Sequence, residues 1–326
     1  MEIVYLKGMP ELSISFEKFG IHVDSSISTA NPLKQILLLK KKIKNTDYKI
    51  HAHLPRAELI TMLACKNQNF IVTRHNCEQF FPNAPKFLSR FLSQLVSKKA
   101  NFIIAISDAV NLYLVENMEV KEIKKIKTIH YGFEPHIAAP REGNTFKVQK
   151  NSKILVLGTI SRLVHQKNLP FLIKAMSMLK QQEIEFELKI VGDGKMLSEL
   201  EDLVRELQLE KNIKFRGKID DIQNFMKELD VFVLTSRYEG FGMVLLEACD
   251  ADLPIIAPRN TSIPEVLGSD YPGLYESDNM NSFVKKIELL LDPDYRNNLG
   301  DLSSQRKNLF SVRKMQISID DIYEKI

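Results

Sequence analysis

The sequence predicts an α/β protein made of two doubly wound domains, each built around a parallel sheet. Three observations support this fold class. The chain has 326 residues, which is enough for two domains of ordinary size. Short apolar runs of strand length alternate with longer amphipathic segments, as βαβ units require. Turns that contain glycine and polar residues follow several of these runs, where ligands bind in such sheets.

The second half of the chain shows the alternation most clearly. Its short apolar runs predict strands, and the segments between them repeat apolar residues at helical spacing. The predicted strands are 154–157, 186–191, 213–215, 231–234 and 255–257, and the predicted helices are 169–179 and 196–207. We expect residues 146–310 to form the C-terminal domain. Residues 311–326 should form a last helix that packs back on the N-terminal domain.

The first half, residues 1–145, predicts the N-terminal domain. Its apolar runs predict strands at 50–52, 70–73 and 102–106. A helix should begin at Asn31 and run to about Lys44, because proline at position 32 suits the first helical position. The polar stretch at 141–152 is the expected linker between the domains.

Composition excludes several classes of protein. The chain is 44% hydrophobic and 26% charged, as is ordinary for a soluble globular protein. No apolar run approaches the length of a membrane span, and Glu2 directly after Met1 is unlike a signal peptide. The three cysteines have no metal-ligand spacing, so we expect a reducing, cytoplasmic compartment. A lone G-x-G at 192–194 fails the dinucleotide fingerprint, and there is no P-loop.

Charge is distributed unevenly along the chain. Residues 1–140 carry 19 basic and 12 acidic side chains, a balance of +7, whereas the remainder carries −3. The basic clusters are Lys40, Lys41, Lys42 and Lys44, and Lys86, Arg90, Lys98 and Lys99. The second cluster shares a helical segment with Phe87, Phe91, Leu92 and Leu95. This segment fits an anionic membrane surface, and it equally fits a solvated face over an ordinary core stripe. Nothing resembles a nucleic-acid recognition module.

Glu239 and Glu247 mark the most informative segment, Ser236-Arg-Tyr-Glu-Gly-Phe-Gly-Met-Val-Leu-Leu-Glu-Ala248. An apolar strand precedes it, and a helix should begin near Gly242. A glycine turn lets backbone approach a ligand closely, and the N–H groups that open a helix favour a phosphate. A glutamate further along the helix can accept hydrogen bonds from sugar or ribose hydroxyls. In isolation, two such glutamates would only complement the helix dipole.

Three further motifs stand at matching distances. They are Gly158-Thr-Ile-Ser-Arg-Leu-Val-His-Gln-Lys-Asn168, Val191-Gly-Asp-Gly194 and Ile263-Pro-Glu-Val266. With the glutamate pair, they resemble the signature of the group 1 glycosyltransferases, the retaining family 4 enzymes of GT-B fold. The resemblance covers nearly the whole chain and is strongest from about Lys153 to Gly268. It implies two Rossmann-like domains that face each other across a cleft.

The resemblance also implies a reaction. A hexose-type sugar would move from a UDP- or GDP-sugar to a glycan or lipid-linked acceptor, with retention of configuration. Such a step belongs to cell-envelope polysaccharide synthesis, for instance of lipopolysaccharide or capsule. The protein would be cytoplasmic and peripheral at the inner face of the membrane. The family requires no metal or other cofactor.

The C-terminal motifs carry the donor-binding roles that the resemblance implies. Arg162 and Lys167 match residues that bind the donor diphosphate, where cations stabilise charge on the departing phosphate. Asn168 replaces the usual glycine, and asparagine also accepts left-handed backbone or caps a helix. Glu239 matches a residue near the transferred sugar, and Glu247 matches one that binds the ribose. The remaining donor-binding positions are Gly240, Phe241, Gly242, Met243 and Val244.

The N-terminal half supplies the other implied site residues. His75 matches a histidine that approaches the donor sugar, and a histidine can hydrogen-bond a hydroxyl or accept a proton. The implied catalytic set is therefore His75, Glu239, Arg162 and Lys167. His51 and His53 match a pair with a structural or an acceptor-positioning role. Ser107 should cap the helix that follows it.

One departure from the family pattern leaves alternatives open. Members usually begin with a strand, a glycine-rich loop and a helix, whereas residues 3–8 here match the second strand. The start of the N-terminal domain is therefore expected to be incomplete. Active glycosyl transfer is the first hypothesis. The alternatives are a nucleotide-sugar epimerase or phosphorylase, and a shortened non-catalytic GT-B protein that binds nucleotide sugar or a partner subunit.

Overall fold

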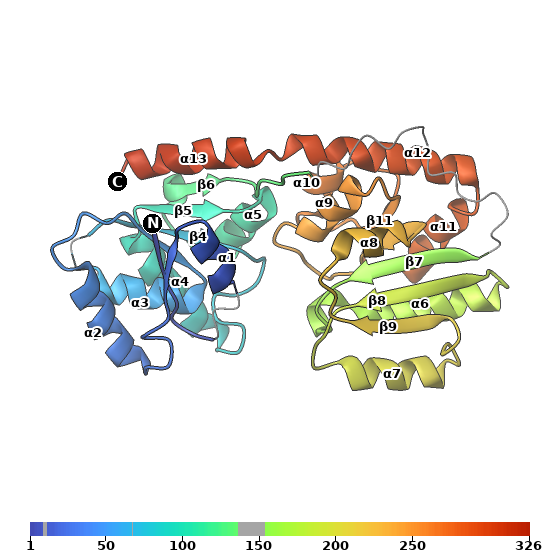
Figure 1. The fold of residues 1–326 in the computed structure, drawn as a ribbon, viewed down its shortest axis with the longest axis horizontal. Helices are drawn as coiled ribbons and strands as arrows, with labels where there is room; N and C mark the ends of the chain where they lie inside the picture. The colour runs from blue at the N-terminus through green and yellow to red at the C-terminus, as the bar shows by residue number, and fades with distance from the viewer. Residues whose placement is uncertain (9–11, 67, 136–153) are drawn as a thin grey trace. The chain divides into compact units, whose positions relative to one another are not determined.

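The computed structural model describes residues 1–8, 12–66, 68–135 and 154–326. It divides into two compact units, which are drawn in Figure 1. Unit 1 comprises residues 1–129 and 317–326, and unit 2 comprises residues 130–316. The expected linker at 141–152 and the expected domain boundary at 145 lie outside the described residues.

Unit 2 contains one six-stranded parallel sheet in the order β12-β11-β10-β7-β8-β9. Its strands are β7 (Leu155–Ile160), β8 (Phe186–Val191), β9 (Ile213–Gly217), β10 (Val231–Val233), β11 (Ile255–Pro258) and β12 (Leu274–Tyr275). Its helices are η2 (His165–Lys167), α6 (Leu169–Gln181), α7 (Leu197–Glu206), α8 (Ile222–Lys227), α9 (Met243–Asp250), α10 (Ile263–Leu267), α11 (Met280–Leu289), α12 (Pro293–Ser304) and η3 (Gln305–Leu309). All predicted strands and both predicted helices of this half are confirmed; β8 has its predicted bounds, and no end of the others is shifted by more than three residues.

The order of the strands in unit 2 fixes where a ligand can bind. The chain runs outward from β7 through β8 to β9, then returns to place β10 on the other side of β7. Figure 1 shows β7, β8 and β9 side by side. This reversal between β7 and β10 is the topological switch point of a doubly wound sheet. Ligands bind there, outside the carboxyl ends of the strands.

Unit 1 contains a four-stranded parallel sheet, β3-β4-β5-β6, and a separate parallel pair, β1-β2. Its strands are β1 (Glu2–Val4), β2 (His22–Asp24), β3 (Ile50–His53), β4 (Phe70–Arg74), β5 (Phe102–Ala105) and β6 (Ile126–Thr128). Its helices are α1 (Ser13–Lys18), α2 (Pro32–Ile43), α3 (Pro55–Ala64), α4 (Lys86–Lys99), α5 (Asp108–Glu116) and η1 (Ile123–Lys125). The last helix, α13 (Val312–Glu324), ends within this unit.

One predicted helix start and one predicted helix cap in unit 1 are confirmed. The Asn31 side chain accepts a hydrogen bond from the Lys34 N–H at 2.9 Å, and Pro32 is the first residue of α2. The Ser107 hydroxyl accepts one from the Val110 N–H at 3.0 Å. Both side chains satisfy N–H groups that the first helical turn leaves without partners.

Helix α4 has an unusual distribution of side chains. Its buried residues are mainly serines, Ser89, Ser93 and Ser97, together with Val96. Its large apolar side chains instead face solvent: Phe87 is 75% exposed and Phe91 is 55% exposed. The apolar stripe is therefore not a core stripe. Of the two interpretations left open by the sequence, the ordinary core face is wrong. Across the part of the chain that is described, no helix is both long and apolar enough to cross a membrane.

Candidate functional site

Two loops at the switch point of unit 2 are joined by hydrogen bonds. One follows β7 and the other follows β10. The Arg237 N–H donates to the Gln166 carbonyl at 2.9 Å, and the Gln166 side-chain amide donates back to the Tyr238 carbonyl at 3.0 Å. The Thr235 hydroxyl donates to the Lys167 carbonyl at 3.0 Å. These bonds bring together two motifs that lie about seventy residues apart in the sequence.

Lys167 and Glu239, both predicted site residues, form an ion pair at the centre of this arrangement. Lys167 Nζ lies 2.6 Å from Glu239 Oε1, and only 6% of Glu239 is exposed. The Glu239 main chain is held as well, because its N–H donates to the Thr261 hydroxyl and its carbonyl accepts from the Ser262 hydroxyl. The position of this carboxylate is therefore fixed from both sides.

Arg162 and Asn168 begin and end the loop after β7. The Arg162 side chain is exposed, and its guanidinium donates to Gln166 Oε1 at 3.3 Å. Asn168 has left-handed backbone, with φ 51° and ψ 39°, and its side chain does not cap α6. Of the two reasons that the sequence offered for an asparagine here, left-handed backbone is confirmed. Asparagine accepts this conformation more readily than most residues do.

Glycines allow the turns of the site to pack closely. Gly192 has φ +131°, and a Cβ there would lie 1.8 Å from the Ser161 carbonyl oxygen. No side chain fits at this position, so the V-G-x-G turn packs directly on the loop after β7. Gly242 has φ +89° and provides no side-chain cap for α9. The Leu245 N–H donates to the Gly242 carbonyl at 2.9 Å, so the N–H groups of Met243 and Val244 before it are the ones that a ligand could bind.

The other residues around α9 separate into two kinds. Phe241 is buried in an aromatic cluster, with ring centroids 5.7 Å from His130 and 5.2 Å from Phe310. Its side chain fixes the turn, which leaves only its main chain to meet a ligand. Glu247 lies in the second turn of α9 and is half-buried. The other predicted donor-binding positions lie in the same segment: Gly240 stands before the turn, and Met243 and Val244 are the first two residues of α9.

Three histidines that the sequence singled out gather at the carboxyl ends of β3 and β4 in unit 1. His53 Nδ1 lies 3.1 Å from His75 Nε2. The rings of His51 and His53 are in contact, with centroids 4.2 Å apart and planes tilted by 31°. His51 Nδ1 lies 2.8 Å from the Tyr323 hydroxyl, and its Nε2 lies 2.6 Å from the Thr73 hydroxyl. Both ring nitrogens of His51 thus have hydrogen-bond partners, so His51 has a structural role in the cluster.

Burial keeps these histidines neutral. It lowers the pKa of His51 to about 3, with a smaller contribution from the neighbouring His53 and His75. It lowers the pKa of His75 to about 4, again helped by His53. A neutral imidazole offers one donor and one acceptor, so His75 can accept a proton or hydrogen-bond a hydroxyl at neutral pH.

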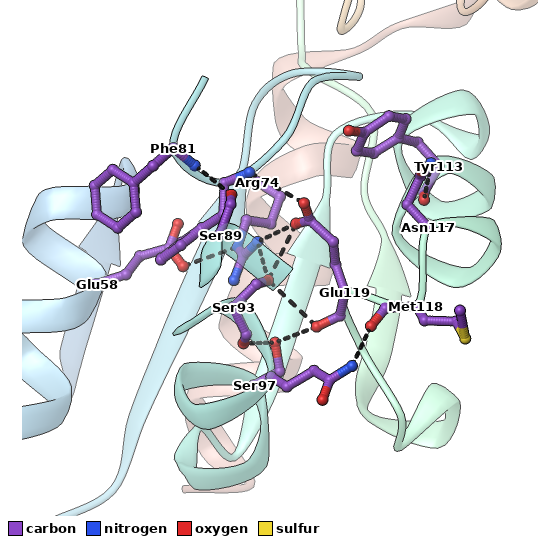
Figure 2. Close-up of polar contacts among 12 residues, drawn as sticks. Glu58, Arg74, Phe81, Ser89, Ser93, Ser97, Tyr113, Asn117, Met118 and Glu119 are labelled. Carbon is purple, nitrogen blue, oxygen red and sulfur yellow. Dashed lines mark hydrogen bonds and ion pairs between the residues drawn. The ribbon is translucent and has the colours of Figure 1, made fainter. Parts of the chain in front are cut away.

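A buried charge network supports the end of β4, directly before His75 in the chain. Figure 2 shows Arg74 between Glu58 and Glu119. Arg74 Nε lies 2.8 Å from Glu58 Oε2, and Arg74 Nη1 lies 3.1 Å from Glu119 Oε2. Ser93 joins both groups, since it accepts from Arg74 at 2.9 Å and donates to Glu119 at 3.0 Å. Burial raises the pKa of both carboxyls, and Arg74 opposes that rise.

Comparison with known proteins identifies the family. The family model described as "Glycosyl transferases group 1" matches residues 140–306, which is half of the chain. This chain belongs to the group 1 glycosyltransferases. It is 27% identical over 241 residues to an uncharacterised glycosyltransferase of Methanocaldococcus jannaschii, covering 73% of this chain and 63% of that protein. The aligned region thus spans less than two thirds of that relative.

Two further similarities cover more of the chain. It is 23% identical over 315 residues to UDP-Gal:alpha-D-GlcNAc-diphosphoundecaprenol alpha-1,3-galactosyltransferase of Escherichia coli, covering 91% of this chain and 81% of that enzyme. The structure of Anabaena HepE in complex with UDP-glucose superposes with a TM-score of 0.81 and 21% identity, covering 100% of this chain and 92% of that one. This likeness shows that the fold is GT-B.

Several residues that shape this candidate site were not predicted from the sequence. Gln166, Thr261 and Ser262 position Arg162 and Glu239 through hydrogen bonds. A signal for the last two exists, because they directly precede the recognised Pro-Glu-Val segment. Tyr323 carries no such signal, since it lies 272 residues from its partner His51.

The pKa of His51 predicts how acid affects this glycosyltransferase. The pKa of the imidazole is near 6.5 in the unfolded chain and about 3 in the folded one, so the folded state disfavours its charged form. This stabilising contribution is present above pH 6.5 and is lost as pH falls toward the folded value. At about pH 5 the loss should be roughly 1–2 kcal/mol. We expect His51→Gln to lose less stability than the parent between neutral pH and that point, as measured by urea unfolding. Identical pH profiles would contradict this expectation.

Proposed function

We propose that the chain transfers a hexose-type sugar, with retention, from a UDP- or GDP-sugar to a glycan or lipid-linked acceptor. One observation carries the proposal. The Lys167–Glu239 ion pair joins the two signature motifs at the switch point of unit 2. A cation, an acid and an open helix start thereby meet where doubly wound sheets bind ligands.

Each residue has a proposed role that follows from its chemistry. Arg162 and Lys167 stabilise the negative charge that grows on the diphosphate as the glycosidic bond breaks. The amides of Gly240–Val244 at the start of α9 bind the same phosphates. Glu247 accepts hydrogen bonds from the ribose hydroxyls. Glu239 and His75 act at the transferred sugar. Because Glu239 is already paired with Lys167, we assign it to sugar positioning and not to nucleophilic attack.

The acceptor and the pathway are proposed from the relatives. The Escherichia coli relative is named for a diphosphoundecaprenol-linked acceptor, which is a lipid. We place this chain in cell-envelope polysaccharide synthesis, such as that of lipopolysaccharide or capsule, on the cytoplasmic face of the membrane. A transfer assay tests this proposal against the alternative that the chain is a non-catalytic GT-B protein. Release of UDP or GDP from a donor sugar, unchanged by EDTA, is the expected result, and no release from any donor would favour the non-catalytic alternative.

Glu247→Ala should weaken nucleotide binding. If the change leaves buried ribose hydroxyls unpaired, the loss should be roughly 1–3 kcal/mol. Isothermal titration calorimetry with UDP and GDP measures it. Glu206→Ala, on the exposed end of α7, is the matched control and should bind as the parent does. Unchanged nucleotide affinity in Glu247→Ala would refute the ribose assignment.

The exposed stripe of α4 supports a membrane-binding role for unit 1. Phe87 and Phe91 share the helix with Lys86 and Lys98, which are also exposed. Helix α2 repeats the combination, with Leu33 and Leu37 exposed among lysines. A helix that presents apolar and basic side chains together binds the interface of an anionic bilayer.

Two of the basic residues identified in the sequence have other partners. Lys99 donates to the carbonyls of Met62 and Cys65 at the end of α3. Lys42 pairs with Asp24 at 2.6 Å and with Glu2 at 2.7 Å. Lys99 and Lys42 therefore stabilise unit 1 through contacts within it. The membrane proposal therefore rests on the remaining lysines of α2 and α4 and on their apolar neighbours.

Vesicle sedimentation tests the membrane proposal. We expect the protein to bind vesicles that contain acidic phospholipid, and to be released at about 0.5 M salt because screening weakens exposed charges. Phe87→Ser with Phe91→Ser should reduce binding, since it removes apolar area from the interface. Leu112→Ser, at an equally exposed apolar position on α5, is the control and should not. Equal binding to neutral and acidic vesicles, or binding to neither, would refute the proposal.

A further inference from the structure

Lys167 is one of the two cations assigned to the diphosphate, and its charge is largely neutralised in the structure. Lys167 Nζ lies 2.6 Å from Glu239 Oε1, and Glu239 is 6% exposed. Opposite charges at this distance cancel much of each other's field at a ligand. A diphosphate that meets only Arg162 and this ion pair would meet little more than one net positive charge. A second uncompensated cation near Arg162 would raise the positive charge that the diphosphate meets.

The loop after β10 supplies such a cation in Arg237. The side chain is exposed, and one guanidinium nitrogen lies 3.5 Å from Asn168 Oδ1. Arg162 is held in the same way, at 3.3 Å from Gln166 Oε1. Both contacts are long, and both acceptors are neutral amide oxygens. Among the described residues, no carboxylate lies within ion-pair distance of either guanidinium. Both arginines therefore keep their full charge.

The two arginines come from different loops but rest on the same short segment. Arg162 contacts Gln166, and Arg237 contacts Asn168. The Arg237 main chain is fixed there too, because its N–H donates to the Gln166 carbonyl at 2.9 Å. Each guanidinium has five donors in a rigid fork, and its amide contact uses only one of them. The remaining donors suit the oxygens of a phosphate.

We infer that Arg237 is a further donor-binding residue, which together with Arg162 clasps the diphosphate of a nucleoside diphosphate. The inference rests on the proposed function, because it assigns the ligand of the same site. Arg237 lies two residues before Glu239, which is proposed to act at the transferred sugar. The β-phosphate carries that sugar, so Arg237 binds the β-phosphate.

Calorimetric titration with UDP, UMP, GDP and GMP tests the inference. In Arg237→Gln, affinity for the diphosphate that the parent binds should fall about tenfold or more, as for a lost charge-assisted hydrogen bond. Affinity for the matching monophosphate should fall much less. Arg237→Lys keeps the charge but loses the forked guanidinium, so its diphosphate affinity should lie between those of the parent and Arg237→Gln. Arg205→Gln, an equally exposed arginine on α7, is the control and should match the parent.

The outcomes separate this inference from the proposed function. If the parent binds a diphosphate and Arg237→Gln binds it equally well, the assignment of Arg237 is wrong and the proposed function stands. If diphosphate and monophosphate affinities fall by the same factor, Arg237 supports the loop without binding the β-phosphate, and the inference is again overturned. If the parent binds neither UDP nor GDP, the proposed function itself fails, and the inference fails with it.

Discussion

Arg162→Ala is expected to lower turnover by about a hundredfold or more, and to lower donor affinity by much less. The diphosphate gains negative charge as the glycosidic bond breaks, so a cation beside it stabilises the transition state more than the bound substrate. The Arg162 guanidinium is exposed at the switch point, and among the described residues its hydrogen-bond partner is the neutral Gln166 amide, so its charge is available. Steady-state rates of nucleotide release from the donor sugar, measured with EDTA present, give both quantities.

Lys167→Ala should show a similar loss of turnover through a second route. It removes a cation and also breaks the ion pair with the Glu239 carboxylate, a residue that is 6% exposed. A buried charge that loses its partner is costly, so Glu239 should move or take up a proton. Arg205→Ala, an exposed arginine in a pair with Asp202, is the control for loss of charge. Near-normal turnover in both Arg162→Ala and Lys167→Ala would show that the diphosphate-clamp assignment is wrong.

Arg74→Ala should destabilise unit 1 by about 3–5 kcal/mol, because it leaves Glu58 and Glu119 buried without a cation. The Arg74 side chain is almost fully buried, and it also covers the Phe80 ring at 4.4 Å. Burial already raises the pKa of both carboxyls, so each binds its proton more tightly folded than unfolded. Their cost to stability therefore grows as pH rises through the unfolded value, near 4.5. The loss in Arg74→Ala should be larger at alkaline than at acidic pH.

Urea unfolding measures this loss, and two other variants make it specific. Arg205→Ala breaks an exposed arginine pair on α7 and should change the free energy of unfolding by less than about 1 kcal/mol. Arg74→Met combined with Glu58→Gln should lose less stability than Arg74→Ala, since it fills the space of the arginine and neutralises one of the two buried carboxylates. A loss in Arg74→Ala no greater than in Arg205→Ala would mean that the network does not stabilise unit 1.

The fold of unit 2 was predictable because each element carries its own local pattern. The six-residue strand β8 was predicted with its observed bounds, since Phe186, Leu188 and Ile190 alternate with polar residues at strand spacing. The start of α6 at Leu169 was also predicted, from apolar residues that recur at helical spacing. The pairing of Lys167 with Glu239 was not predicted from spacing. Both residues were recognised singly, and only the strand order β10-β7 brings their loops together.

Unit 1 shows where local patterns fail. The apolar stripe of α4 gave no sign of which way it faces, because Ser89, Ser93 and Ser97 are equally compatible with solvent. Their partners come from elsewhere in the chain: Ser93 bonds to Arg74 and Glu119, and Ser89 accepts from the Phe81 N–H. The predicted strand at 3–8 is confirmed only as β1, Glu2–Val4, which pairs with β2 alone. Tyr323 joins the histidine cluster from the other end of the chain, a contact that no sequence periodicity reports.

A crystal structure of the chain with the nucleoside diphosphate that it binds best would test the central claim most directly. We predict that the diphosphate lies at the carboxyl ends of β7 and β10, against Arg162, Lys167 and the first N–H groups of α9. The ribose hydroxyls should lie within hydrogen-bond distance of Glu247. A nucleotide bound elsewhere in unit 2, or one with its diphosphate turned away from the Lys167–Glu239 pair, would contradict the proposed site.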